Sequence, residues 1–175
     1  MENKFFIKNS LYIESPNFDD RPKDIETDTI IIHSISLPEM EYDNDHVSLL
    51  FQNKLSRDHD TSFKELEQLK VSSHLFIKRT GEIIQFVPLD KRAWHAGKSE
   101  YLGRRDFNDF SVGIELHGSV LDYYTDKQYV SLKKTIAELK QIFPSIQDSN
   151  ILGHSDISPN RKSDPGPNFE WEKIR

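Results

Sequence analysis

The chain has 175 residues, of which 23 are basic and 29 acidic, so its formal net charge is −6 at pH 7. This length suits one folding unit, and we expect a single domain over residues 1–175. Because its net charge is negative, the chain lacks the broad positive field that binding to a phosphate backbone requires, which argues against a nucleic-acid partner. No cysteine is present, so disulfides and thiolate metal sites are excluded. Any metal must therefore be held by histidine and carboxylate.

The N-terminal region contains only a short apolar run, Phe5-Phe6-Ile7, which polar and charged residues soon interrupt. It lacks the apolar central stretch of an export signal, and no later segment approaches the length of a membrane span. The absence of cysteine agrees with a reducing compartment. We therefore expect a cytoplasmic monomer without a membrane partner.

The first predicted element is a buried strand over Thr27–Ile35, where a β-branched run too short for most helices ends near His33 and Ser34. The region from Pro38 to Lys70 is charged and irregular, with short helical fragments expected around Val47–Phe51 and Ser62–Leu69. Irregular regions of this kind often carry function, so we expect it to line or cover a site.

Two apolar runs, Val71–Arg79 and Glu82–Val87, flank Thr80-Gly81. Because glycine permits positive φ, this pattern predicts a β-hairpin. A further strand is predicted over Ser111–His117, which alternates around an apolar centre.

The clearest helix begins at Thr125, which forms a capping box with Gln128, and its apolar residues recur at helical spacing until Pro144. A short strand over Asn150–Leu152 follows. This order of elements predicts an α/β fold with a mixed central β-sheet flanked by helices.

Three polar residues near strand ends form a candidate metal site. His33 ends the first strand, His154 follows the last, and Asp164 lies in a loop stiffened by prolines. Catalytic zinc commonly takes three histidine or carboxylate ligands and leaves one position for water. Spacing alone identifies this set weakly, because other histidines are available. The alternative is that both histidines bond to backbone carbonyls and that Asp164 caps a turn.

Two further charged residues are candidates for catalysis. Glu115 lies in the middle of an apolar strand, where a carboxylate is costly unless it is paired or belongs to a site. The alternative is that it points to solvent from a half-exposed strand, with Ile114 and Leu116 on the opposite face. Lys162 is close enough to Asp164 along the chain to reach the same cleft, although a solvated loop lysine is the commoner outcome.

Aromatic residues near the centre of the chain are candidates for substrate contact. Trp94 and Tyr101 offer flat faces of the kind on which sugars and peptides pack, although Trp94 also suits core anchoring. His95 follows Trp94 in a loop of small residues, as suits either a substrate wall or a packed loop. His74 and His117 alternate within strands, which favours structural or cleft-wall positions.

The chain resembles the Amidase_2 family, and most closely its AmpD-type 1,6-anhydro-N-acetylmuramyl-L-alanine amidases, in the segments IIIHSISLP, VSSHLFIKRTGEIIQFVPLDKRAWHAGKSEYLGR, NDFSVGIELHG, YTDKQY and GHSDISPNRKSDPGPNFEW. These segments keep the order and spacing of the family and span about Ile30 to Arg175. The resemblance implies a mixed central sheet flanked by helices. It also implies that His33, His154 and Asp164 bind Zn²⁺.

The resemblance further implies that Glu115 is the acid and base of the reaction and that Lys162 stabilises developing negative charge. An ordinary glutamate pKa of about 4.3 would leave Glu115 ionised, as a base must be. His117 is a candidate for a supporting position beside the site.

The substrate-contacting positions depart from the family pattern in two places. Ser34 stands where AmpD-type sequences are expected to carry asparagine, and the basic positions are filled by Lys70 and by Arg105 next to Asp106. The predicted substrate-binding residues are Trp94, His95, Tyr101, Lys70, Arg105 and Ser34.

The implied function is zinc-dependent hydrolysis of the amide between the lactyl group of N-acetylmuramic acid and L-alanine, with a small muropeptide as substrate. Because the sequence shows no export signal, we expect the substrates to be muropeptides that return to the cytosol for cell-wall recycling. The competing interpretations are a lytic amidase acting on intact wall and a recognition module without catalysis. The complete ligand set and Glu115 argue against the last.

Overall fold

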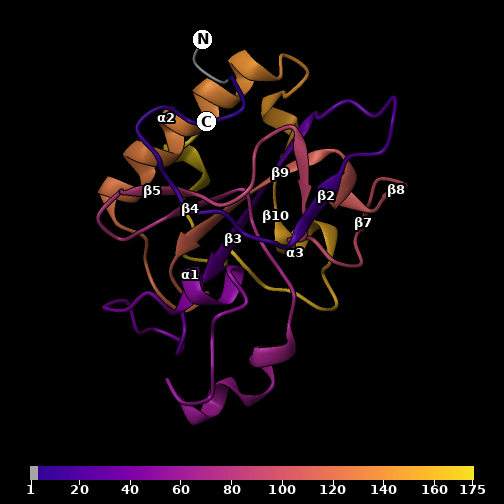
Figure 1. Cartoon of the computed structure of the whole chain (residues 1–175). Helices are drawn as coiled ribbons and strands as arrows, with labels where there is room; N and C mark the ends of the chain where they lie inside the picture. The colour runs from indigo at the N-terminus through magenta and orange to yellow at the C-terminus, as the bar shows by residue number, and fades with distance from the viewer. Residues whose placement is uncertain (1–3) are drawn as a thin grey trace.

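The structure is a computed structural model that describes residues 4–175. Its main sheet has six strands in the order β1-β5-β4-β9-β3-β10. The strands are β1 Leu11–Tyr12, β5 Ile83–Gln85, β4 Leu75–Ile77, β9 Ser111–His117, β3 Thr29–Ile35 and β10 Ile151–Gly153. Figure 1 shows β3 and β9 running through the middle of the molecule.

The two longest strands, β3 and β9, are parallel and pair over seven positions, with His33 beside Glu115. β4 and β10 also run parallel to these strands, whereas β4 and β5 are antiparallel. The sheet is therefore mixed, as predicted. Paired residues on neighbouring strands face the same side, so His33 and Glu115 point to one face.

One face of the sheet is covered by α2 Asp126–Ile142, the orange helix in Figure 1. The capping box of Thr125 and Gln128 forms as predicted. Apolar residues of α2 pack against alternate residues of β3, β4 and β9 in one core cluster, which includes Tyr129, Leu132, Ile136, Leu139, Ile30, Ile32, Leu75, Ile77, Val112, Ile114 and Leu116.

The opposite face carries two smaller apolar clusters. One joins α1 His46–Phe51 to Phe76 and Phe86, and the other joins Ile31 to Phe107 and Ile157. Since side chains alternate along a strand, the residues between Ile30 and Ile35 divide between the two faces. His33 and Glu115 reach the face opposite α2.

The remaining elements are short. Two ribbons form beside the main sheet, β2 Phe18–Asp20 with β6 Lys91–Ala93 and β7 Glu100–Tyr101 with β8 Arg104–Arg105. The helix α3 spans His154–Ile157, and 3-10 turns occur at Thr61–Lys64, Leu66–Gln68, Phe107–Asp109, Asp148–Asn150 and Trp171–Lys173. The magenta segment that joins α1 to β4 extends away from the sheet in Figure 1.

Most predicted elements are present with shorter bounds. The hairpin is confirmed by the antiparallel β4 and β5, with Gly81 at φ +83° in the connection. The helical fragment expected after Ser62 is two 3-10 turns, and the ribbons of β2, β6, β7 and β8 had no prediction. Within residues 4–175 no helix combines the length and the apolar character that crossing a membrane demands.

Candidate metal and amidase site

The metal candidates converge at the ends of two parallel strands. β10 pairs with β3 so that Gly153 lies beside Ile32, which brings His154 next to His33 although they are 121 positions apart in the chain. The Nδ1 atoms of the two histidines are 2.9 Å apart. Oδ2 of Asp164 lies 3.2 Å from each of these nitrogens. All three residues are buried.

This geometry fits a single bound metal ion. The ligand atoms of His33, His154 and Asp164 all lie within 4.8 Å of one another. Tetrahedral ligands about 2.0–2.2 Å from zinc are roughly 3.3–3.6 Å apart, close to the separations found here. Two nitrogens and one oxygen, with no thiolate, match the open donor sets of catalytic metal sites.

The electrostatics favour the metal-binding protonation states. Burial lowers the pKa of His33 to about 4, so its ring is neutral at neutral pH. Burial alone would raise the pKa of Asp164, but its close contacts with His154 and His33 hold that pKa well below the ordinary value. Neutral His33 and ionised Asp164 are the forms that bind metal.

Glu115 is buried beside this cluster, with 9% of its surface exposed. Its Oε2 atom is buried without a hydrogen-bond partner among the described residues. Burial raises the pKa of Glu115 well above its usual range, Asp164 raises it further, and Lys162 opposes them. The solvent-exposed alternative is therefore excluded, since the carboxyl group faces the same side as His33.

A cavity of about 340 Å³ opens onto the cluster and brings together Ser34, Lys162 and Asp164. Lys162 is exposed on its wall. Two lining residues without a sequence prediction are Glu39 and Ser119, which are joined by a 2.7 Å hydrogen bond from the serine hydroxyl. Glu39 belongs to the irregular region that was expected to line a site.

The other substrate candidates are more scattered. Arg105 lines a neighbouring cavity of about 800 Å³ and forms a 2.9 Å ion pair with Glu100. Arg161 lines both cavities, which makes them adjacent. Tyr101 packs against the cluster around Ile31. Lys70 is exposed and lies outside the linings of both cavities.

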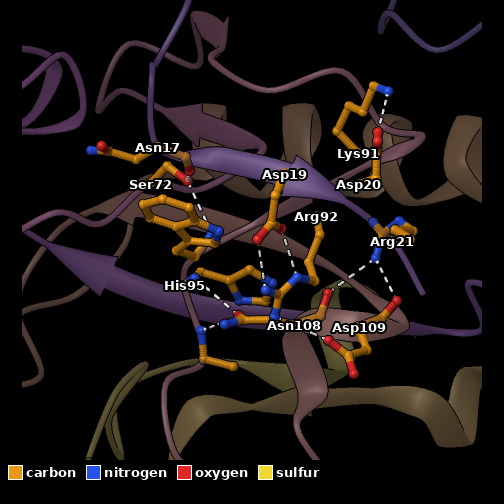
Figure 2. A network of polar contacts seen from close by, with 12 residues as sticks. Asn17, Asp19, Asp20, Arg21, Ser72, Lys91, Arg92, His95, Asn108 and Asp109 are labelled. Carbon is orange, nitrogen blue, oxygen red and sulfur yellow. Dashed lines mark hydrogen bonds and ion pairs between the residues drawn. The ribbon is translucent and has the colours of Figure 1, made fainter.

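Neither Trp94 nor His95 is among the residues that line these two cavities. Figure 2 shows His95 within a polar network that includes Asn108 and the ion pair of Asp19 with Arg92. His95 is buried, and its Nδ1 lies 2.9 Å from Nε2 of His33. This placement favours a supporting position over the substrate contact predicted from the sequence.

The two strand histidines occupy structural positions. His74 is buried, and its Nδ1 accepts a hydrogen bond from the backbone N–H of Gly113. His117 packs edge-on against the ring of Tyr42 and also contacts Phe76, away from the metal cluster.

Asn108 and Ser111 were not predicted from the sequence. Asn108 accepts a hydrogen bond from the backbone N–H of His95, and the hydroxyl of Ser111 contacts the ring of His95. The sequence signal that could have pointed to Ser111 is its position as a polar residue at the start of an apolar strand.

Comparison with known proteins agrees with this geometry. The family model described as "N-acetylmuramoyl-L-alanine amidase" matches residues 23–167. The 1,6-anhydro-N-acetylmuramyl-L-alanine amidase AmpD of Salmonella typhimurium is 43% identical over 175 residues, covering 100% of this chain and 93% of the relative.

Two solved structures extend the comparison. A crystal structure of a selenomethionine derivative of AmpD superposes with a TM-score of 0.95 at 40% identity, covering 100% of this chain and 97% of that one. AmpDh3 of Pseudomonas aeruginosa, solved in complex with an anhydromuramic pentapeptide, has a TM-score of 0.61 at 25% identity, covering 99% of this chain and 65% of that one. With the family match and the identity to AmpD, these findings show that the chain belongs to the N-acetylmuramoyl-L-alanine amidase family.

Proposed function

We propose that this chain is a zinc-dependent amidase that cuts the bond between the lactyl group of 1,6-anhydro-N-acetylmuramic acid and L-alanine in small muropeptides. The observation that carries the proposal is the buried cluster of His33, His154 and Asp164 beside Oε2 of Glu115, which has no hydrogen-bond partner among residues 4–175, within an amidase-family chain. The domain is taken as the whole of residues 1–175.

If zinc is held by these three residues, it would supply Lewis acidity, which can polarise a carbonyl group and bring the pKa of bound water from 15.7 towards about 7. His33 and His154 would hold the ion through Nδ1, and Asp164 would hold it through a carboxylate oxygen. All three residues are buried, so the surrounding packing restrains their side chains.

Glu115 accepts the proton of the attacking water and passes it to the departing alanine nitrogen. The sequence led us to expect an ordinary pKa, whereas burial raises the pKa well above it. A carboxyl group with ordinary acidity is a weak base, and proton transfer is most efficient when the pKa lies near the working pH. The raised pKa therefore suits one group to act as base and then as acid.

Lys162 stabilises the negative charge that develops on the carbonyl oxygen during attack. Its exposed side chain lies on the wall of the same cavity as Asp164, so the substrate carbonyl can bind between the lysine and the ligand cluster. Such an interaction is strongest in the transition state and acts on turnover more than on binding. Ser34 on the same wall and Arg105 in the adjacent cavity are the better placed substrate contacts.

The proposed substrate follows from the relatives, because AmpD of Salmonella typhimurium is named for the 1,6-anhydro form. We also propose that the chain acts on muropeptides in the cytosol. The test compares release of peptide from anhydro-N-acetylmuramyl-tripeptide, the reducing muropeptide and intact sacculi at equal enzyme, by chromatography and mass spectrometry. A missing contact is worth ~1–3 kcal/mol, so the anhydro form should react roughly ten- to two-hundred-fold faster. Equal or faster attack on sacculi would replace this proposal with a lytic amidase.

Metal content tests the site itself. The purified chain should hold about one zinc ion, since an open set of three ligands forms a single catalytic site. His154→Ala should lose zinc and activity together, as measured by elemental analysis and the muropeptide assay. Full zinc occupancy in that variant would refute the ligand assignment.

A further inference from the structure

The rings of His33 and His154 each use the nitrogen that faces away from the cluster, Nε2, to contact the same short segment of the chain. Nε2 of His33 lies 2.9 Å from Nδ1 of His95, and Nε2 of His154 lies 3.1 Å from the carbonyl oxygen of Ala96. The two ligands come from β3 and from the start of α3, yet their second contacts come from neighbouring residues.

The carbonyl of Ala96 determines the tautomer of His154. A carbonyl oxygen only accepts, so Nε2 of His154 carries the proton and leaves the Nδ1 lone pair for a metal. Nη2 of Arg161 also lies 3.3 Å from this nitrogen. It has shorter contacts with the carbonyl oxygens of Ala96 at 2.7 Å and Lys98 at 3.0 Å, which use its two protons.

A chain of hydrogen bonds determines the tautomer of His33 in the same way. The hydroxyl of Ser111 donates its single proton to the carbonyl oxygen of Phe107. Its oxygen, 3.2 Å from Nε2 of His95, must therefore accept from that nitrogen. In a neutral His95 ring, Nδ1 is then the acceptor, so His33 donates from Nε2 and presents the Nδ1 lone pair to the cluster.

The segment that provides these contacts is itself held from both sides. Oδ1 of Asn108 accepts hydrogen bonds from the backbone N–H of His95 at 3.1 Å and of Ala96 at 2.8 Å, as Figure 2 shows. The backbone N–H of Trp94 donates to Oγ of Ser72 at 3.0 Å. A Cβ atom at Gly113 would lie 2.5 Å from Cγ of His95, so the ring packs directly on the β9 backbone.

We propose that the Trp94–Ala96 segment, held by Asn108, is a single positioning element that orients both histidine ligands and selects their metal-binding tautomers. His95 and Asn108 are then positioning residues that act through His33 and His154 without touching substrate. The inference rests on the proposed metal site. It assigns a role to His95 and Asn108, which take no part in the proposed mechanism. Partners of this kind typically change metal affinity by 10- to 100-fold when removed.

The test measures zinc affinity of the full chain by competition with a chelator, after metal removal. His95→Phe, which keeps a ring but removes the acceptor, should weaken zinc binding roughly 10- to 100-fold. His95→Asn, which returns an acceptor near the position of Nδ1, should recover part of the loss. Ser111→Ala removes only a hydroxyl and should weaken binding less. His117→Phe is the control, because His117 is also a buried histidine, and its ring packs against Tyr42 and Phe76.

A second readout separates positioning from general destabilisation. In the zinc-loaded wild-type chain, nitrogen-15 NMR should show slowly exchanging Nε2–H signals for His33 and His154. His95→Phe should remove or expose the His33 signal and leave that of His154, whereas Asn108→Ala should disturb both. If the His95→Phe chain binds zinc within twofold of wild type and keeps the His33 signal, the inference is wrong.

Failure of the proposed function has a different signature. The wild-type chain would then show both Nε2–H signals and the variant effects on zinc affinity, but it would not release peptide from anhydro-N-acetylmuramyl-tripeptide. Conversely, normal hydrolysis by the wild type together with unchanged zinc affinity in His95→Phe and Asn108→Ala would overturn the positioning element and leave the amidase assignment standing.

Discussion

Glu115 illustrates how one residue differs from its strand neighbours in both environment and task. Ile114 and Leu116 pack with α2 in the main core, whereas Glu115 faces the metal cluster with a buried oxygen that has no partner among residues 4–175. An unpaired buried carboxyl group is costly, and such strain is retained where chemistry needs it. The burial that destabilises the carboxylate also raises its pKa well above the ordinary value.

We predict that Glu115→Gln keeps the fold and the metal but loses proton transfer, because the amide is nearly isosteric and is not a base. Turnover should fall by roughly two or more powers of ten. Steady-state hydrolysis of a defined muropeptide, with metal content measured on the same sample, checks this. A rate near that of wild type would remove Glu115 from the reaction.

We predict that Lys162→Ala lowers kcat more than it raises KM, because its proposed partner is charge that exists only during the reaction. Arg105→Ala is a useful comparison, since Arg105 lies in the adjacent cavity and should act mainly on KM. Separate determination of both constants distinguishes the two residues. A pure rise in KM for Lys162→Ala would make it a binding residue.

At the level of elements, β9 contributes to both faces of the sheet, whereas α2 covers one face only. One face of β9 completes the core beneath α2, and the other presents Glu115 and His117. α2 contributes its apolar stripe and its capping box, and none of its residues lines the cavity at the cluster.

Leu132 lies fully buried on α2, so Leu132→Ala should cost about 2–5 kcal/mol of unfolding free energy. Val130 lies on the same helix with 54% of its surface exposed, and Val130→Ala should change stability by roughly 0.5 kcal/mol or less. Urea unfolding of both variants tests the assignment of the buried face. Similar losses in the two variants would contradict it.

His117, at the end of β9, should make the unfolding free energy depend on pH. Burial lowers the pKa of His117 to about 4, the charges of Lys78 and Arg79 push in the same direction, and Asp45 opposes them. The unfolded side chain titrates near 6.5, so the unfolded state binds the proton first. This contribution to stability is complete above about pH 6.5 and is lost as the pH falls towards 4.

His117→Phe should therefore lose less stability than wild type between pH 7 and pH 5, by roughly 1–2 kcal/mol. The comparison isolates His117, because His33, His74 and His95, whose pKa values burial also lowers, are present in both proteins. Denaturant unfolding at the two pH values measures the difference. Parallel pH profiles for variant and wild type would show that His117 is not held neutral.

At the scale of the molecule, the metal site joins segments that are remote in the chain. Its ligands come from β3, from the start of α3 and from the loop that follows α3, so a bound ion links parts of the chain that separate on unfolding. A ligand that binds only the folded state stabilises that state by mass action.

Removing zinc with a chelator should therefore lower the unfolding free energy by about 3–4 kcal/mol relative to the protein with zinc at 100 to 1,000 times its Kd. His154→Ala should show no such difference, because it lacks a ligand. Urea unfolding with and without zinc checks both. A chelator effect of equal size in the variant would point to binding elsewhere.

Local patterns in the sequence were sufficient for much of the fold. The β-branched run before His33, the alternation around Glu115 and the capping box at Thr125 predicted β3, β9 and α2, because these signals act between near neighbours in the chain. The ribbon of β2 with β6 had no comparable signal, since its pairing of Asp19 with Arg92 depends on approach of distant segments.

By itself, the sequence determined the class of fold, the family likeness and the candidates His33, His154, Asp164 and Glu115, because residue types and their order specify which chemistry is available. Only the tertiary structure decided which atoms meet. The burial that raises the pKa of Glu115, and the contact of His95 with His33 across 62 positions, depend on how the strands pack. Distances of this kind follow from the packing of the whole chain, which no local pattern encodes.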